Sequence, residues 1–368
     1  MPNHYSASPR RILVIRSSAI GDIVFASPFA GALRRSYPDA YIAWLVEPGI
    51  DGLLQANPYI DELILWPKKE WQGLWRARRY GAFVKAVCAF ARMLKAHQFD
   101  WAIDLQGLLK SGLLAWMSGA KCRTGLGSSE GSQYLMTQVI AKGGDIARIS
   151  SEYLFIAEQL NLDAGAFLPE LFLPEDAVQR ADALRCEHGL QRGGYAVLSP
   201  FTTRPQKHWF EDEWRDLIGL LKSRYGMTAV ILGGPADKEA AERMAGGGFG
   251  AVSLAGQTRI TETAALVQSA GVLVGVDTGV THMAVAFNTP AVILFGSTCP
   301  YRNTCRANAR VIWLGLACSP CKRRPTCHGA YTCMRDISAE MVMCEVAQIL
   351  KRALPGTAQQ GVCGESLS

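Results

Sequence analysis

Short apolar runs rich in β-branched residues alternate with longer segments of helical periodicity, and this alternation constrains the fold more than any other feature of the sequence. In the first half the runs are "RILVI" (11–15), "AYIAWLV" (40–46), "ELILW" (62–66) and "FDWAIDL" (99–105). A segment with helical spacing, "FVKAVCAFARMLKAH" (83–97), lies between the last two. Strands that alternate with helices predict a parallel sheet with helices on its faces.

The alternation starts again in the second half of the chain. Its runs are "YAVLSP" (195–200), "MTAVILGGP" (227–235), "GAVSLAG" (250–256), "GVLVGVD" (271–277) and "PAVILFGS" (290–297). The 368 residues also exceed the roughly 250–300 that a single core supports. We therefore predict an α/β chain with two doubly wound, Rossmann-like domains, 1–180 and 190–354, followed by a disordered tail, 355–368.

The boundary between the halves is marked by Pro169, Pro174 and the pair Gly193-Gly194, which flank a charged helix that we expect to be solvated. These features place the linker near 172–193. Two Rossmann-like halves that face each other put the carboxyl ends of both sheets on one cleft, which is where open α/β sheets bind ligands. Functional residues are therefore expected directly after strands.

Charge and hydropathy narrow the class of partner. The net charge of +6 is too small for a general nucleic-acid binder, but it suits a protein that meets anionic substrates or an anionic membrane face. No apolar run is long enough to span a bilayer, and the start "MPNHYSASPR" lacks the apolar region of a secretory signal. We therefore expect a cytoplasmic protein without a nucleic-acid partner.

The first polar motif, "RSSAIGD" (16–22), joins the first strand to a helix. It contains one glycine, so it is not the dinucleotide-binding fingerprint. Ser17, Ser18 and Asp22 are typical caps for a helix that begins near Ile23. Alternatively, Asp22 is a catalytic residue at the carboxyl end of the strand. The motif alone leaves both interpretations open.

Two motifs in the second half suit a bound diphosphate. "SPFTTRPQKHW" (199–209) offers hydroxyls and cations between a strand and a helix, although a plain polar connection is the alternative. "GVDTGVTHMAVAF" (275–287) places Asp277 at a strand end and His282 in the first helical turn, where free N–H groups favour an anion. The alternatives here are an N-cap aspartate and a core histidine.

Two further segments in the first half carry polar and basic residues. "DLQGLLKSG" (104–112) follows a strand and directs Gln106 and Lys110 toward the expected cleft. "WPKKEWQGLWRARRY" (66–80) interleaves aromatic side chains with cations. Such a run is usually a solvated face, but cations beside tryptophan also suit an anionic lipid surface. We assign Lys68 and Lys69 to sugar-acid contacts. The residues assigned to the lipid surface are Arg76, Arg78 and Arg79.

Six of the eleven cysteines fall between Cys299 and Cys333. In "CSPCKRRPTCHGAYTC" (318–333), the spacing is close to that of a four-thiolate metal knuckle for zinc or iron, with His328 as a substitute ligand. The predicted ligands are Cys318, Cys321, Cys327 and Cys333. Buried free thiols and redox-labile pairs are the alternatives, since a cytosolic disulfide is unusual.

The motifs "RSSAIGD", "DLQGLLKSG", "FTTRPQKHW" and "DTGVTH", in this order, resemble the lipopolysaccharide heptosyltransferase family, glycosyltransferase family 9, over residues 11 to about 352. The resemblance implies a GT-B fold and an inverting transfer from ADP-heptose, bound by the second half, to an acceptor bound by the first. The implied catalytic residue is Asp22. The implied donor-binding residues are Thr202, Thr203 and Lys207 at the diphosphate, Asp277, Thr278, Gly279 and His282 around the sugar nucleotide, and Asp237 near the ribose.

The resemblance also implies the acceptor and the location. It is greatest to heptosyltransferase I, which acts on the Kdo of lipid A, whereas the cysteine-rich end is more similar to heptosyltransferase II. A heptosyltransferase II-type enzyme, another surface-glycan glycosyltransferase and a non-catalytic nucleotide-sugar-binding protein therefore stay open. No catalytic cofactor is implied, and the enzyme would be peripheral at the cytoplasmic face of the inner membrane. The expected acceptor-binding residues are Ser18, Gly21, Lys68, Lys69, Gln106 and Lys110.

Overall fold

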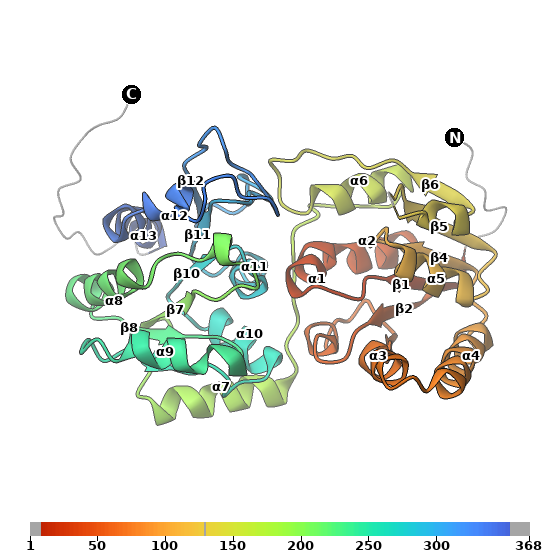
Figure 1. The fold of residues 1–368 in the computed structure, drawn as a ribbon, viewed down its shortest axis with the longest axis horizontal. Helices are drawn as coiled ribbons and strands as arrows, with labels where there is room; N and C mark the ends of the chain where they lie inside the picture. The colour runs from red at the N-terminus through yellow and green to blue at the C-terminus, as the bar shows by residue number, and fades with distance from the viewer. Residues whose placement is uncertain (1–8, 129, 354–368) are drawn as a thin grey trace. The chain divides into compact units, whose positions relative to one another are not determined.

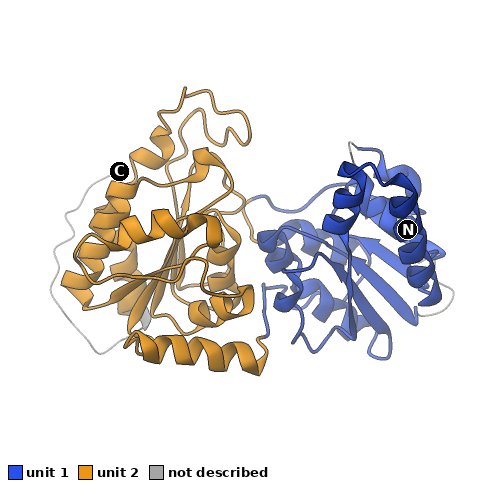
Figure 2. Ribbon diagram, turned by 60° about the horizontal axis from the view of Figure 1, so that its bottom comes forward, with its two compact units in different colours: residues 1–146, 150–172 blue, residues 147–149, 173–368 orange. Residues whose placement is uncertain are grey.

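The computed structural model describes residues 9–128 and 130–353, so the predicted disordered tail, 355–368, lies outside the described residues. The chain forms two compact units (Figure 2). Unit 1 contains the residues up to Ile146 together with Ser150–Phe172, and unit 2 contains Ala147–Ile149 together with the residues from Leu173 on. The division after Phe172 is earlier than the predicted domain end at residue 180.

Unit 1 is built on a parallel sheet of six strands within the described residues, in the order β3-β2-β1-β4-β5-β6 (Figure 1). Its strands are β1 (Arg11–Ile15), β2 (Tyr41–Val46), β3 (Glu62–Leu65), β4 (Trp101–Asp104), β5 (Cys122–Leu126) and β6 (Gln138–Ile140). Its helices are α1 (Ile20–Ala26), α2 (Pro28–Ser36), α3 (Lys68–Arg76), α4 (Tyr80–Ala96), α5 (Leu109–Met117) and α6 (Ser151–Gln159). The register pairs Ile15 with Leu45 on one side and with Asp104 on the other.

Both faces of this sheet are buried, because successive side chains of a strand point to opposite faces. Ile12 and Val14 of β1 pack in one cluster with residues of α2 and α6. Leu13 and Ile15, the alternate residues, pack in a second cluster with residues of α4 and α5. This double burial explains why "RILVI" is apolar throughout rather than alternating with polar residues.

Unit 2 repeats the architecture with a six-stranded parallel sheet among its described residues, in the order β12-β11-β10-β7-β8-β9. Its strands are β7 (Tyr195–Ser199), β8 (Thr228–Ile231), β9 (Val252–Ser253), β10 (Val272–Val276), β11 (Ala291–Phe295) and β12 (Ala309–Trp313). Its helices are α7 (Glu175–Glu187), α8 (Glu211–Tyr225), α9 (Lys238–Ala245), α10 (Ile260–Gln268), α11 (Gly279–Ala286), α12 (Thr332–Arg335) and α13 (Ala339–Ala353). Counted from the first strand of each unit, the spatial order is the same in both sheets.

Helix α7 corrects one expectation. It is not a solvated linker helix, because Ala177, Ala181 and Leu184 are buried and the helix packs against α10 of unit 2. These three residues recur at intervals of four and three, so they form one apolar stripe on an otherwise charged helix. Because most other residues of the helix are polar or charged, the stripe is not evident from the sequence.

Each sheet has one topological switch point, between β1 and β4 in unit 1 and between β7 and β10 in unit 2. At such a point the connections leave the sheet in opposite directions, and a crevice opens beyond the carboxyl ends of the strands. The predicted α/β class with two Rossmann-like domains is thus confirmed. The switch points are also the places where ligand-binding residues are expected.

Candidate active site

The switch point of unit 2 is bridged by an ion pair. Lys207 lies at the end of the short 3₁₀ segment Pro205–Lys207 that follows β7, and Asp277 directly follows β10. Nζ of Lys207 is 2.6 Å from Oδ2 of Asp277, and both side chains are largely buried. The two motifs predicted to bind a diphosphate therefore meet in space.

Two further groups surround the Asp277 carboxylate. Nε2 of His282 lies 3.2 Å from Oδ1, and Oγ1 of Thr298 donates a hydrogen bond to Oδ2 at 2.5 Å. Burial alone would raise the pKa of Asp277, but the hydrogen bond and charge of His282 and the charge of Lys207 outweigh it and hold the pKa well below its ordinary value. His282 is itself buried, with Nδ1 2.8 Å from the hydroxyl of Tyr301. Asp277 is therefore a fixed anion that orients the neighbouring lysine.

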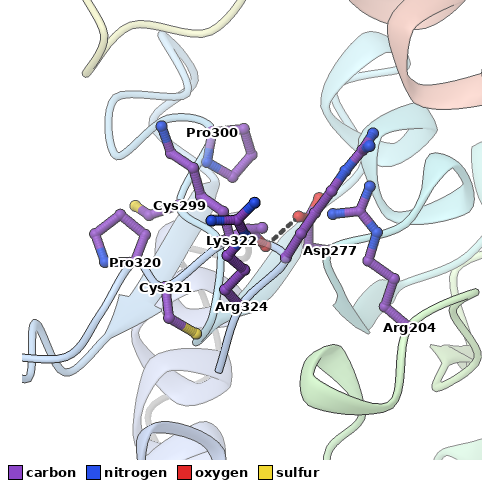
Figure 3. A pocket seen from close by; sticks show the side chains of 10 residues that line it. Arg204, Asp277, Cys299, Pro300, Pro320, Cys321, Lys322 and Arg324 are labelled. Carbon is purple, nitrogen blue, oxygen red and sulfur yellow. Dashed lines mark hydrogen bonds between the residues drawn. The ribbon is translucent and has the colours of Figure 1, made fainter. Parts of the chain in front are cut away.

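A pocket of about 660 Å³ opens beside Asp277 (Figure 3). This volume is typical of a site for a small molecule. Three of the lining residues, Arg204, Asp277 and Thr298, follow the carboxyl ends of β7, β10 and β11. The other lining residues are Cys299, Pro300, Pro320, Cys321, Lys322, Arg323 and Arg324. Of these lining residues, only Asp277 was predicted to bind the donor.

The remaining predicted donor residues do not line this pocket. Thr278 is the N-cap residue of α11 and Gly279 is the first residue of that helix, so both lie next to Asp277. The carbonyl of Thr202 is 2.9 Å from Nε2 of His208, and Thr203 is exposed. The side chain of Asp237 accepts a hydrogen bond from the backbone N–H of Gly234 at 2.8 Å, so it caps its own turn. Their contacts with a donor stay predictions.

In unit 1, Asp22 lies in the first turn of α1, which begins at Ile20 rather than near Ile23. Its Oδ2 accepts a hydrogen bond from the backbone N–H of Ala19 at 3.2 Å, so the side chain does cap the helix. The same oxygen is 2.5 Å from Nη2 of Arg16, whose side chain is only 10% exposed. Asp22 is 43% exposed, so capping leaves its carboxylate open to a substrate.

Glu47, which directly follows β2, joins several polar groups of unit 1. Its Oε1 is 2.8 Å from Nζ of Lys68 and accepts a hydrogen bond from Oγ of Ser18 at 2.9 Å. Burial alone would raise the pKa of Glu47, but the hydrogen bonds from Lys68 and Ser18 prevail and lower it. Ser17 Oγ lies 3.3 Å from the same oxygen of Glu47, and neither serine makes a side-chain cap bond to α1, in contrast to the alternative interpretation. The position of Glu47 at the end of an apolar run was the signal that sequence reasoning missed.

Gln106, which follows β4, completes the switch point of unit 1. Its Oε1 accepts hydrogen bonds from the backbone N–H and the hydroxyl of Ser17, at 3.2 and 2.9 Å. Nζ of Lys110 and of Lys68 lie 5.9 and 5.7 Å from the centre of the Trp66 ring. Burial, and then the charge of Lys68, lower the pKa of Lys110. Unit 1 thus gathers at its strand ends the predicted residues Ser18, Gln106, Lys68 and Lys110, with Gly21 in the first turn of α1.

The basic and aromatic run forms α3 and the turn that follows it. Its remaining cations are all exposed, with Lys69 and Arg76 on α3 and Arg78 and Arg79 in the turn before α4. Trp75 and Tyr80 are 57% and 50% exposed, and their ring centres are 5.1 Å apart. Among the described helices, none is both long and apolar enough to cross a membrane.

Comparison with known proteins identifies the family. Residues 87–332 match glycosyltransferase family 9 (heptosyltransferase). The chain belongs to this family. A relative from Salmonella typhimurium, lipopolysaccharide heptosyltransferase 1, is 28% identical over 291 residues, which cover 79% of this chain and 89% of the relative. The predicted family is confirmed, and the chain is a glycosyltransferase.

Solved structures of the family share the fold. The structure of a family 9 glycosyltransferase from Veillonella parvula has a TM-score of 0.76 and 22% identity, covering 93% of this chain and 97% of that one. The E. coli heptosyltransferase WaaC with ADP-2-deoxy-2-fluoro heptose has a TM-score of 0.68 and 23% identity, covering 92% and 99%. The GT-B fold that the sequence resemblance implied is thus confirmed, and at these identities the likeness concerns the fold alone.

The four cysteines predicted as metal ligands lie close enough to affect one another electrostatically, and the metal knuckle stays a prediction. No three His, Cys, Asp or Glu side chains among residues 9–128 and 130–353 are placed to hold one ion. The thiols are free, and burial together with three neighbouring thiols raises the pKa of Cys333 to about 11. Within the segment, Oγ of Ser319 donates a hydrogen bond to the carbonyl of Gly296. The residues predicted as ligands were Cys318, Cys321, Cys327 and Cys333.

Proposed function

We propose that this glycosyltransferase moves L-glycero-D-manno-heptose from ADP-heptose to the Kdo of the lipopolysaccharide inner core, with inversion at the anomeric carbon. The observation that carries the proposal is the pair of strand-end sites, an accessible carboxylate, Asp22, in unit 1 and a cationic pocket beside Asp277 in unit 2. The ligand of the E. coli structure supports the donor. The name of the S. typhimurium relative supports the acceptor.

In the proposed step, an acceptor hydroxyl attacks the anomeric carbon of the heptose from the face opposite to ADP. A bond forms from the hydroxyl oxygen to this carbon, the bond from the carbon to the phosphate oxygen breaks, and Asp22 takes the hydroxyl proton. Arg16 orients the carboxylate through the 2.5 Å ion pair. The charge that develops on ADP is stabilised by Lys207, Arg204 and the N–H groups of the first turn of α11.

We assign the polar cluster around Glu47 in unit 1 to the acceptor. Lys68 and Lys110 supply positive charge for the carboxylates of sugar acids, and Gln106 supplies an amide that is fixed by Ser17. Arg76, Arg78 and Arg79 are exposed beside Trp75 and suit an anionic lipid surface. The enzyme would then work on its lipid acceptor at the cytoplasmic face of the inner membrane.

The transfer is tested by incubating the protein with ADP-heptose and either Kdo-bearing lipid A or the same lipid that already carries one heptose. Mass spectrometry of the lipid is expected to show the gain of one heptose on the first acceptor only. Gain on the second acceptor only would make the chain a heptosyltransferase II-type enzyme. Binding of ADP-heptose without transfer to either lipid would favour a different surface glycan or a non-catalytic nucleotide-sugar-binding protein.

A further inference from the structure

One wall of the unit 2 pocket comes from the segment 318–324, here called the basic loop, which the proposed mechanism does not use. Pro320, Cys321, Lys322, Arg323 and Arg324 of this loop line the pocket. Arg204 and Asp277 (Figure 3) line it from the strand ends. Thr298 lines it as well. The pocket therefore combines four cationic side chains with one carboxylate.

Hydrogen bonds fix the basic loop to the strand-end turns of the same unit. The backbone N–H of Lys322 donates to the carbonyl of Ser297 at 2.7 Å, just after β11. Nε2 of Gln206 donates to the carbonyl of Lys322 at 3.0 Å. Gln206 is buried and directly precedes Lys207, so it connects the loop to the turn that contains Lys207. The loop is thus part of the pocket wall and not a distant insertion.

The described residues of the protein do not balance the charge of the pocket. Asp277 is already neutralised by the ion pair with Lys207. Within the described part of the chain, no ion pair joins the four lining cations to a carboxylate. These cations are Arg204, Lys322, Arg323 and Arg324. Unbalanced guanidinium groups around a pocket of this size favour an anionic ligand, because guanidinium binds phosphate oxygens in a bidentate manner.

We propose that the basic loop is a phosphate-binding element of the donor site, in which Arg323 and Arg324 contact the diphosphate of a nucleoside-diphosphate sugar opposite Lys207. This inference rests on the proposed function, since it assumes that unit 2 binds such a donor. Gln206 is a positioning residue that holds the loop against the turn of Lys207. The cysteine-rich segment thereby acquires a role in donor binding.

The test compares ADP and AMP binding by calorimetry for the wild-type protein and the double variant Arg323→Gln/Arg324→Gln. The affinity for ADP is expected to fall about 10- to 100-fold, as for the loss of charge-assisted hydrogen bonds, and the affinity for AMP is expected to fall much less. Lys207→Ala is the positive control. Arg180→Gln/Arg192→Gln is the matched control, because both arginines are exposed on unit 2 and neither lines the pocket.

The outcomes separate this inference from the proposed function. If the wild-type protein binds ADP and the double variant binds it equally well, the role of the loop is overturned and the donor assignment stands. Unchanged ADP affinity with a raised KM for the lipid acceptor would also overturn it, because the cations would then serve the acceptor. No ADP binding by the wild-type protein would contradict the donor assignment itself. Thermal unfolding of each variant checks that the fold is intact.

Discussion

At the scale of single residues, Asp277 shows how pairing outweighs burial. The carboxylate is largely buried, yet Lys207, His282 and Thr298 surround it, and its pKa is held well below the ordinary value. A group whose pKa is lower in the folded chain contributes stability above its unfolded pKa of about 3.9, and that contribution is lost as the pH falls through the folded value. The ion pair therefore stabilises unit 2 over the whole neutral range.

Asp277→Asn is expected to lower the free energy of unfolding by about 3 kcal/mol at pH 7, because it leaves Lys207 largely buried without its counter-charge. Urea unfolding of both proteins measures this difference. It should stay constant from about pH 8 to pH 5 and shrink only below about pH 4, where the unfolded carboxyl becomes protonated. A difference that grows on acidification would show that the carboxylate is not held ionised.

At the scale of elements, α3 and its following turn divide the basic run into two parts. Lys68, at the start of α3, is paired with Glu47 at the strand ends. Arg76, Arg78 and Arg79 lie at the other end of the helix and are exposed. This division agrees with the assignment of the lysine to the acceptor sugar and of the arginines to the lipid surface, which remains a prediction.

Replacing Arg76, Arg78 and Arg79 with Gln is expected to weaken binding to anionic vesicles by about 1 kcal/mol per charge, with a loss that shrinks at high salt. Co-sedimentation with vesicles measures this loss, and ADP binding should not change. The matched control replaces three exposed cations near the amino ends of the strands of the same sheet, Arg10, Lys95 and Lys121. Equal loss in the control, or none in either variant, would show that the run is only a solvated helix face.

The central strands were predictable because each is a short apolar run. β1 coincides with "RILVI", and β7, β10 and β11 lie within the expected runs. The strands β5, β6 and β12 were not predicted. β5 reads "CRTGL" and β6 has three residues, and both lie toward one edge of their sheet, so neither has the apolar run that double burial requires.

At the scale of the whole molecule, two sheets with the same strand order each place polar residues at the switch point. Ser17 meets Gln106 in unit 1, and Lys207 meets Asp277 in unit 2. The expectation that functional residues follow strands singled out Gln106, Lys207 and Asp277, whereas Ser17 was expected only as a helix cap. This expectation was not sufficient for the basic loop, because hydrogen bonds between segments distant in sequence, such as Gln206 and Lys322, bring that loop to the pocket.

In the proposed reaction the two tasks fall to different units, with proton removal in unit 1 and donor binding in unit 2. Loss of the Asp22 carboxylate should therefore slow transfer strongly and spare donor binding. Asparagine keeps a side-chain oxygen that can still accept the hydrogen bond from Ala19, so Asp22→Asn tests the base while preserving the cap. Asp163→Asn is the matched control, because Asp163 also pairs with an arginine, Arg35, and accepts a hydrogen bond from a backbone N–H.

The most direct measurement is the rate of heptose transfer by Asp22→Asn beside its affinity for ADP. We expect the rate to fall by about 10²–10⁴-fold, as for the loss of a general base, with an ADP affinity within about twofold of the wild-type value. Asp163→Asn should match the wild-type protein in both measurements. Transfer by Asp22→Asn at the wild-type rate would contradict the account, because Asp22 would then be a helix cap and nothing more.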